Sequence, residues 1–308
     1  MLEIRDVTRS FGALKALDQV SFQVPGGRLT GFVGANGAGK TTAMRILMGV
    51  LSMDSGEVLF DGQPVSRAAQ ADFGYMPEER GLYPKMGVRE QLVYFAQLHG
   101  LSAAKAGANT DRLLSQLGLT ARANDKVEKL SLGNQQRAQI AAALVHDPSV
   151  LILDEPFSGL DPLAVETVMG VLREFAAKGA PILFSSHQLD VVERITDDLI
   201  IIAAGQIKAE GATSALRERY AGSRYHLVLP GSDAASATWV ETVPGVTNVT
   251  TAAPDLAELE PAAAVDVAFD ASAEVAQKVL AACLERGPVE GFGRLIPPLS
   301  EVFKEVVA

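Results

Sequence analysis

A glycine-rich stretch near the amino terminus constrains the fold more than any other part of the chain. Residues 34–42 read GANGAGKTT, which fits the pattern G-x-x-x-x-G-K-[ST]. The apolar run of residues 29–33 predicts a buried strand before this stretch, and the apolar positions within residues 41–50 predict a helix after it. Because the pattern requires a strand before it and a helix after it, the sequence indicates an α/β core built around this loop.

The residue types of the loop point to phosphate binding. Glycines let the backbone curl so that successive N–H groups point inward, and the following helix adds the positive end of its dipole. Lys40 can reach the β- and γ-phosphates of a nucleotide as a point charge, and the Thr41 hydroxyl can help to hold Mg²⁺. A chance glycine-rich turn is the alternative, which the flanking strand and helix oppose. The loop residues predicted to bind nucleotide are Gly34, Asn36, Gly37, Ala38, Gly39, Lys40, Thr41 and Thr42.

Composition limits the class of protein. The chain has 308 residues, 48% of them apolar, and a formal net charge of −10. This length allows roughly two domains, and the acidic balance argues against general nucleic-acid binding, which needs a basic face. No apolar run approaches the ~18 residues of a membrane span, and the start lacks the pattern of a secretory signal. We therefore expect a soluble, cytoplasmic chain without a nucleic-acid partner, which reaches a membrane only through another protein.

On both sides of the loop, the sequence pattern predicts further strands and helices. Alternating segments at residues 2–5 and 20–24 predict strands before the loop, and the pattern from about residue 88 to 144 is helical. The other predicted segments are strands 56–60, 73–76, 150–153, 182–185 and 199–203 and helices 163–177 and 189–195. This order predicts a mostly parallel sheet buried on both faces, with a helical subdomain of about residues 85–145 inserted into it.

The composition changes after about residue 220, where acidic residues outnumber basic ones. The pattern there indicates a small ferredoxin-like α+β domain, because its order is βαββαβ plus one helix. The segments are strand 225–229, helix 234–243, strands 246–251 and 265–269, helix 273–286, a weaker strand 289–295 and a helix from residue 299. The predicted domains are residues 1–218 and 221–308. The single cysteine, Cys283, is interpreted as a small core residue rather than a reactive thiol.

Two adjacent carboxylates end the strand predicted at residues 150–153. Asp154 can bind Mg²⁺ directly or through water, and Glu155 is then placed to orient the attacking water or accept its proton. Taken alone, the pair reads as a helix N-cap, but the phosphate loop earlier in the chain opposes that interpretation.

Three further segments indicate which kind of phosphate-loop protein this is. Residues 130–137 read LSLGNQQR and lie shortly before the two carboxylates, residues 158–161 read SGLD, and residues 185–187 read SSH. In this order and spacing the chain resembles the nucleotide-binding subunit of an ABC transporter over residues 1 to about 215. The resemblance implies the P-loop NTPase fold, ATP and Mg²⁺ as ligands, and ATP hydrolysis.

The resemblance also implies roles for His187 and Phe11. His187 follows an apolar strand at the carboxyl end of the sheet, where ligands bind in such folds, and by resemblance contacts the γ-phosphate and the water. Taken alone, a histidine there is more often structural. Phe11 stands where the family places an aromatic ring on adenine, with an ordinary core or surface phenylalanine as the alternative. The catalytic residues are then Glu155, His187 and Lys40.

In the family two subunits pack head to tail, and the signature segment of one covers the γ-phosphate held by the other. Here Ser131 and Gly133 would supply the hydroxyl and amide donors at a helix N-terminus. Leu132 and Asn134 depart from the usual glycine and glutamine of that segment.

Glu78 is another departure, because the family usually has a glutamine at that position. A carboxylate can still bind Mg²⁺ but cannot donate a hydrogen bond as an amide can. The predicted metal ligands are therefore Thr41, Glu78 and Asp154. Residues 79–86 either face a transmembrane subunit, as the resemblance implies, or form a solvated loop.

The sequences FVGANGAG at residues 32–39 and PLSEVF at residues 298–303 resemble the branch that exports drugs, antibiotics or sodium, which includes the daunorubicin-resistance type. In that branch one ATPase chain pairs with a separate integral membrane permease, and an extra carboxyl-terminal domain is typical. The resemblance implies a head-to-tail homodimer that powers export at the cytoplasmic face of the plasma membrane. Two alternatives stay open: a soluble, non-transport ABC ATPase, and a nucleotide-binding scaffold with weak hydrolysis.

Overall fold

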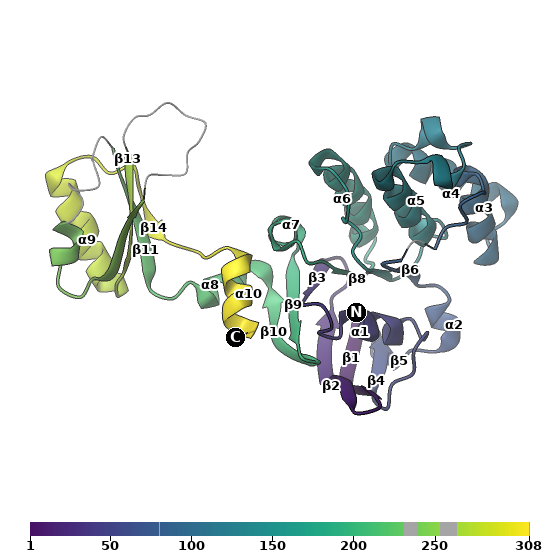
Figure 1. Ribbon diagram of the computed structural model, residues 1–308, viewed down its shortest axis with the longest axis horizontal. Helices are drawn as coiled ribbons and strands as arrows, with labels where there is room; N and C mark the ends of the chain where they lie inside the picture. The colour runs from purple at the N-terminus through teal and green to yellow at the C-terminus, as the bar shows by residue number, and fades with distance from the viewer. Residues whose placement is uncertain (80, 231–238, 253–263, 308) are drawn as a thin grey trace. The chain divides into compact units, whose positions relative to one another are not determined.

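The computed structural model of the chain describes residues 1–79, 81–230, 239–252 and 264–307 (Figure 1). The chain divides into two compact units, one made of Met1–Thr213 with Phe303–Ala308 and the other of Ser214–Val302. Each unit has a hydrophobic core of its own. Within the described ranges, none of the helices is both long and apolar enough to cross a membrane.

The first unit contains two sheets that share one core. The antiparallel sheet has the order β2-β1-β4-β5 and consists of β1 (Leu2–Phe11), β2 (Leu14–Val24), β4 (Ser55–Phe60) and β5 (Gln63–Pro64). On β2 the buried residues Val20, Phe22 and Val24 alternate with exposed ones, as expected for a strand with one buried face. The ring of Phe22 on β2 packs against that of Phe32 in the other sheet, with 5.2 Å between the ring centroids.

The second sheet of this unit positions the candidate site. Its order is β10-β9-β3-β8-β7-β6, with β3 (Leu29–Val33), β6 (Gly74–Met76), β7 (Leu151–Leu153), β8 (Ile182–Ser185), β9 (Asp198–Ala203) and β10 (Gln206–Ala212). All of these strands are parallel except β10, which pairs antiparallel with β9 at one edge, so the predicted mostly parallel sheet is confirmed. Because the carboxyl ends of parallel strands lie at one edge, the segments after β3, β6, β7 and β8 come together.

The helices of the first unit include the predicted inserted subdomain. This subdomain is formed by α3 (Val88–Leu98), α4 (Ala103–Gln116) and α5 (Leu132–Leu144), with single turns at Thr120–Arg122 and Val127–Lys129. The other helices are α1 (Lys40–Leu47), α2 (Arg67–Gln70), α6 (Pro162–Ala177) and α7 (Leu189–Ile195). α1 is shorter than the predicted helix of residues 41–50, because Gly49 takes a left-handed φ of 67° that ends it.

The sheet of the second unit has the order β12-β13-β11-β14, and all neighbouring strands are antiparallel. Its strands are β11 (Arg224–Pro230), β12 (Thr247–Ala252), β13 (Ala264–Asp270) and β14 (Gly291–Arg294). The position of β13 between β11 and β12 is that of a split βαβ fold, in agreement with the ferredoxin-like prediction.

Among the described residues, three helices accompany this sheet in the chain. α9 (Ala273–Arg286) packs on one face of the sheet through Ala276, Val279 and Cys283, while α8 (Thr213–Tyr220) precedes the sheet and α10 (Leu299–Val307) follows it. Half of the helix predicted at residues 234–243 lies outside the described residues, and residues 239–242 of the other half form a 3-10 turn.

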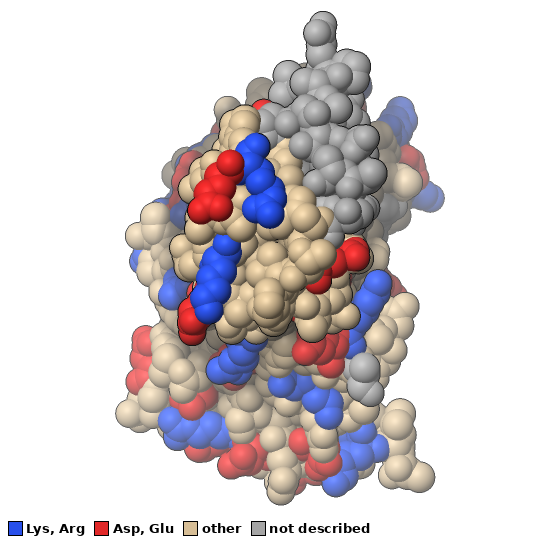
Figure 2. Space-filling model, turned by 90° about the vertical axis from the view of Figure 1, so that its left-hand side faces the viewer, with Lys and Arg blue, Asp and Glu red and all other residues tan. Residues whose placement is uncertain are grey.

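Charges of both signs are mixed on the face of the molecule shown in Figure 2, where acidic and basic side chains lie interspersed among uncharged ones. On α9 the side chains of Lys278 and Glu274 form an ion pair, with 2.8 Å between Nζ and Oε1. This mixture differs from the continuous basic stripe that attracts a nucleic-acid backbone.

The thiol of Cys283 should be unreactive in the native protein. Its side chain is 1% exposed in the core of the second unit, and burial raises its pKa to about 11. With this pKa, only about one thiol in a thousand is ionised near pH 8. Since the thiolate is the reactive form, the native thiol should react very slowly. We expect a chromogenic disulfide reagent to label the denatured chain at one thiol and to leave the native chain unlabelled. Labelling of the native protein at the rate of a free thiol would show that this core opens readily.

Candidate active site

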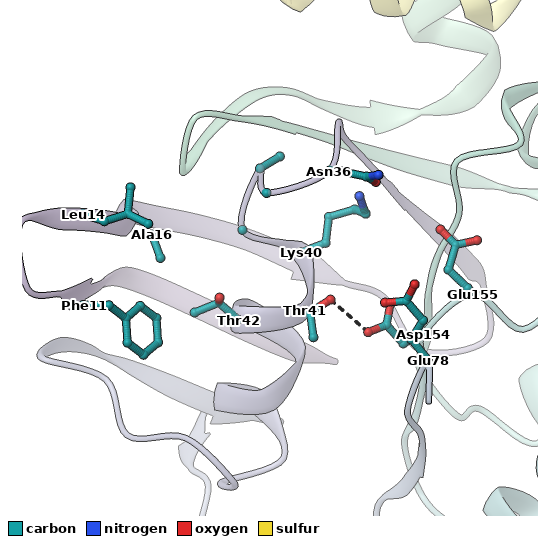
Figure 3. Close-up of a pocket in the computed structure, with 13 residues that line it drawn as sticks. Phe11, Leu14, Ala16, Asn36, Lys40, Thr41, Thr42, Glu78, Asp154 and Glu155 are labelled. Carbon is teal, nitrogen blue, oxygen red and sulfur yellow. Dashed lines mark hydrogen bonds between the residues drawn. The ribbon is translucent and has the colours of Figure 1, made fainter. Parts of the chain in front are cut away.

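The glycine loop, the first hairpin and the segments after β6 and β7 surround one cavity of about 430 Å³ (Figure 3). In Figure 3, Phe11 and Leu14 stand on one side of the start of α1, Glu78 and Glu155 stand on the other, and Lys40 lies between them. The lining residues are Phe11, Leu14, Ala16, Asn36, Gly37, Ala38, Gly39, Lys40, Thr41, Thr42, Glu78, Asp154 and Glu155. The structure therefore brings together the predicted loop residues, other than Gly34, with the carboxylates predicted from distant parts of the sequence.

Three glycines shape the loop. Gly37 and Gly39 have φ values of 79° and 112°, a region that residues with a side chain rarely adopt. A Cβ atom on Gly39 would lie 2.7 Å from the carbonyl oxygen of Ala16, and one on Gly34 would lie 2.4 Å from that of Ile202. Gly34 thus permits close packing against β9, which explains why it is needed without lining the cavity.

The ammonium group of Lys40 sits inside the loop. Its Nζ donates to the carbonyl oxygens of Gly34 at 2.6 Å and Ala35 at 3.3 Å. Burial lowers the pKa of Lys40, and the nearby carboxylates of Glu155, Asp154 and Glu78 oppose that shift. A buried positive charge at the start of a helix suits a phosphate group, which supplies compensating negative charge.

The carboxylate of Asp154 is held from both sides. Thr41 Oγ1 donates to Asp154 Oδ2 at 3.0 Å (dashed in Figure 3), and Ser185 Oγ at the end of β8 donates to Asp154 Oδ1. Across the residues that the structure describes, no three His, Cys, Asp or Glu side chains gather closely enough to enclose a metal ion. Mg²⁺ usually keeps several waters and binds through one or two carboxylates plus substrate phosphates. The oxygens of Thr41 and Asp154, with Glu78 on the same cavity, fit an ion of that kind.

Glu155 is fixed by its backbone and faces His187. Its side chain is 13% exposed, and its Oε2 atom lies 2.9 Å from Nδ1 of His187, whose side chain is 60% exposed. The Glu155 amide donates to Ser185 Oγ at 2.9 Å, and its carbonyl accepts from Gln136 Nε2 at the same distance. Its φ of 52° is left-handed, which is uncommon for a residue with a side chain and frequent at functional sites. A carboxylate in this position can accept a proton from water bound in the cavity.

Phe11 lies at the end of β1 and exposes 47% of its surface beside the loop. The guanidinium carbon of Arg9 lies 4.9 Å from the centroid of its ring, and Arg9 is itself held by Asp54 through a 2.8 Å hydrogen bond. A half-exposed ring at the cavity is suited to stacking on a nucleotide base, as the resemblance implies. Leu14 and Ala16 on β2 add apolar surface beside it that the sequence analysis did not identify.

Ser131 and Gly133 lie away from this cavity, at the amino-terminal end of α5. The Ser131 hydroxyl accepts a 3.4 Å hydrogen bond from the Asn134 amide as the helix N-cap, and Leu132 beside it is 61% exposed. The chain thus does not bring these two predicted nucleotide-binding residues to its own phosphate loop.

Two family models match the chain. One, described as ABC transporter, matches residues 17–158, and the other, described as the C-terminal domain of ATP-binding protein DrrA1-3-like, matches residues 211–307. The uncharacterized ABC transporter ATP-binding protein YhaQ of Bacillus subtilis (strain 168) is 43% identical over 220 residues, which cover 71% of this chain and 74% of that protein. The chain belongs to the ABC transporter ATP-binding proteins.

Other ABC proteins show the same relationship. The Nod factor export ATP-binding protein I of Paraburkholderia xenovorans (strain LB400) is 40% identical over 218 residues, covering 70% of this chain and 72% of that protein. Among solved structures, an ATP-binding subunit of an ABC transporter matches with a TM-score of 0.66 and 32% identity, over 71% of this chain and 93% of that one. A nucleotide-free ATP-binding cassette from an ABC transporter matches with a TM-score of 0.61 and 27% identity, over 69% of this chain and 91% of that one.

These findings confirm the P-loop NTPase fold and the family predicted from the motifs. As the ATP-binding subunit of an ABC transporter, the chain binds ATP and is an ATPase. The cavity at the phosphate loop is the candidate active site of this ABC ATPase, because Lys40, Asp154 and Glu155 line it together.

Proposed function

We propose that this ABC ATPase powers the export of a drug, antibiotic or other small molecule through a separate integral membrane permease. The match of residues 211–307 to the carboxyl-terminal domain of DrrA1-3-like proteins supports this branch, and a relative named for export supports the direction. The chain would then work at the cytoplasmic face of the plasma membrane, attached through the permease and without a nucleic-acid partner. Its functional domains would be residues 1–218 and 221–308.

The placement of Glu155 at the phosphate-loop cavity is the observation that carries the hydrolytic part of the proposal. Lys40 and the loop amides of residues 36–41 bind the β- and γ-phosphates, and Phe11 stacks on the adenine. Glu155 orients the attacking water and accepts its proton, while His187 holds that carboxylate and contacts the γ-phosphate. A base and a positive charge held beside the γ-phosphate would stabilise the charge that develops during hydrolysis.

Thr41, Asp154 and Glu78 are the residues that would hold Mg²⁺ beside the phosphates. Held there, such an ion would supply positive charge beside the phosphate oxygens. Ser185 supports this role because its hydroxyl fixes the second oxygen of Asp154.

Two copies of the chain would pack head to tail to complete each site. Ser131 and Gly133 lie away from the cavity of their own chain, at a helix N-terminus whose Leu132 is exposed, so they are free to meet a second copy. There they would donate to the γ-phosphate held by the partner's loop. Closure around ATP and reopening after hydrolysis would then move the permease.

Affinity purification tests the transport assignment. The full chain would be tagged in its native cell, membranes solubilised gently, and the co-purifying proteins quantified. We expect a polytopic membrane protein at near-equal stoichiometry and an ATPase rate that rises when the pair is reconstituted in lipid. Co-purification of ribosomes or a soluble complex would move the protein to a non-transport ABC class. A membrane complex with negligible turnover would favour the scaffold interpretation.

A further inference from the structure

A buried glutamine on α5 holds the segment that carries Glu78. Gln139 is 4% exposed, and its Nε2 donates to the carbonyl oxygens of Pro77 at 2.7 Å and Glu79 at 3.2 Å. These two carbonyls flank Glu78 on either side, so one amide group fixes the main chain immediately before and after that carboxylate. The position of Glu78 at the cavity therefore depends on a helix that lies more than fifty residues further along the chain.

A second buried glutamine on the same helix holds the other carboxylate segment in the same way. Gln136 is 5% exposed, and its Nε2 donates to the carbonyl oxygens of Glu155 at 2.9 Å and Pro156 at 3.1 Å. Gln136 and Gln139 are three residues apart and so project from neighbouring positions on one side of the helix. Hydrogen bonds from α5 therefore hold both the segment around Glu78, the proposed metal ligand, and the segment around Glu155, the proposed base.

Packing alone does not account for the amide of Gln139. Among the atoms of the described residues, Gln139 Oε1 is buried without a hydrogen-bond partner, which lowers stability. An apolar side chain of similar length would fill the same space without that cost. What it could not supply is the pair of N–H donors that hold the two carbonyls beside Glu78.

We propose that Gln139 is a positioning residue that sets the place of the Glu78 carboxylate relative to Asp154, and thereby the affinity of the nucleotide site for its divalent cation. This inference rests on the proposed function, because it takes Glu78 and Asp154 as the residues that hold Mg²⁺. Residues that orient a metal ligand typically change metal affinity by about ten- to a hundredfold when replaced.

The test is a titration of Mn²⁺, followed by its electron paramagnetic resonance signal, into the full chain with a non-hydrolysable ATP analogue. We expect Gln139→Met to raise the metal concentration at half saturation about tenfold. Affinity for the analogue in excess chelator should change by less than about twofold, because the phosphate loop itself is untouched. An unchanged metal titration would overturn the inference.

Gln91→Met is the matched control. Gln91 is 1% exposed in the same helical subdomain, and its side chain makes two hydrogen bonds to the main chain of Tyr83, further along the loop that follows Glu78. The two variants remove the same amide from a buried position, so a general loosening of the subdomain would shift both metal titrations alike. If Gln139→Met does not fold, Gln139→Asn, which keeps the amide on a shorter arm, takes its place in the same titration.

A double-mutant cycle separates this inference from the proposed function. Glu78→Gln alone should weaken metal binding, and adding Gln139→Met to it should have no further effect, because the positioned carboxylate is gone. If Glu78→Gln leaves the titration unchanged, the metal assignment itself is wrong. If Glu78→Gln weakens binding while Gln139→Met does not, only the positioning role fails.

Discussion

Replacing Glu155 by glutamine should leave ATP binding nearly intact and lower the steady-state rate of hydrolysis by at least about a hundredfold. The amide has the shape of the carboxylate and can still face His187, which lies 2.9 Å from the carboxylate oxygen. It cannot accept a proton from water, so the loss should appear in kcat, with KM for ATP little changed. The measurement is phosphate release by the purified chain beside equilibrium binding of ATP.

Glu166→Gln serves as the matched control, since it makes the same chemical change on the exposed surface of α6, where the Glu166 side chain is 65% exposed. Its kcat should equal that of the unmodified chain. Near-normal hydrolysis by Glu155→Gln would show that another group activates the water, and the role given to Glu155 would then be wrong.

Lys40→Ala should weaken ATP binding by about a hundredfold or more, which corresponds to ~2.7 kcal/mol. The ammonium of Lys40 lies inside the loop, where its donors already point at two carbonyl oxygens and its charge is shielded from water. A charge–phosphate hydrogen bond in such a setting is among the strongest that a protein makes. Removing it deprives the bound phosphates of this buried positive charge.

Calorimetric titration with ATP measures this effect, and Lys208→Ala is the control, because Lys208 is an exposed residue of β10. The melting temperature of Lys40→Ala without nucleotide should not fall, since burial of an ammonium opposes folding. Equal ATP affinity in the two variants would show that the phosphates bind elsewhere.

Much of the first unit follows from local pattern. The strands at residues 29–33, 151–153 and 182–185 are apolar runs between turn or helix signals, and their parallel pairing follows from the helices between them. Given that pairing, the residues after β3 and β7 must meet at one edge, which is why Lys40, Asp154 and Glu155 could be placed together from sequence.

The rest depends on long-range contacts that leave little trace in the sequence. β10 reads as polar and small, with only Ala209 buried, and becomes a strand because it pairs with the edge of β9. Gln139 looks like any helix-surface glutamine until the structure places Pro77 and Glu79 against it. Leu14 and Ala16 reach the cavity through the register of the first hairpin, which the short segments predicted at residues 2–5 and 20–24 do not reveal.

The left-handed backbone at Glu155 implies a trade-off between the stability of the fold and ATP hydrolysis. A residue with a side chain at a φ of 52° costs on the order of 1 kcal/mol relative to glycine, so this position lowers the stability of the fold for as long as a residue with a Cβ atom occupies it. Glu155→Gly would relieve this strain and at the same time remove the proposed base. Variants made robust for laboratory work should accordingly be selected under a demand for ATP hydrolysis, with thermal survival as the second criterion.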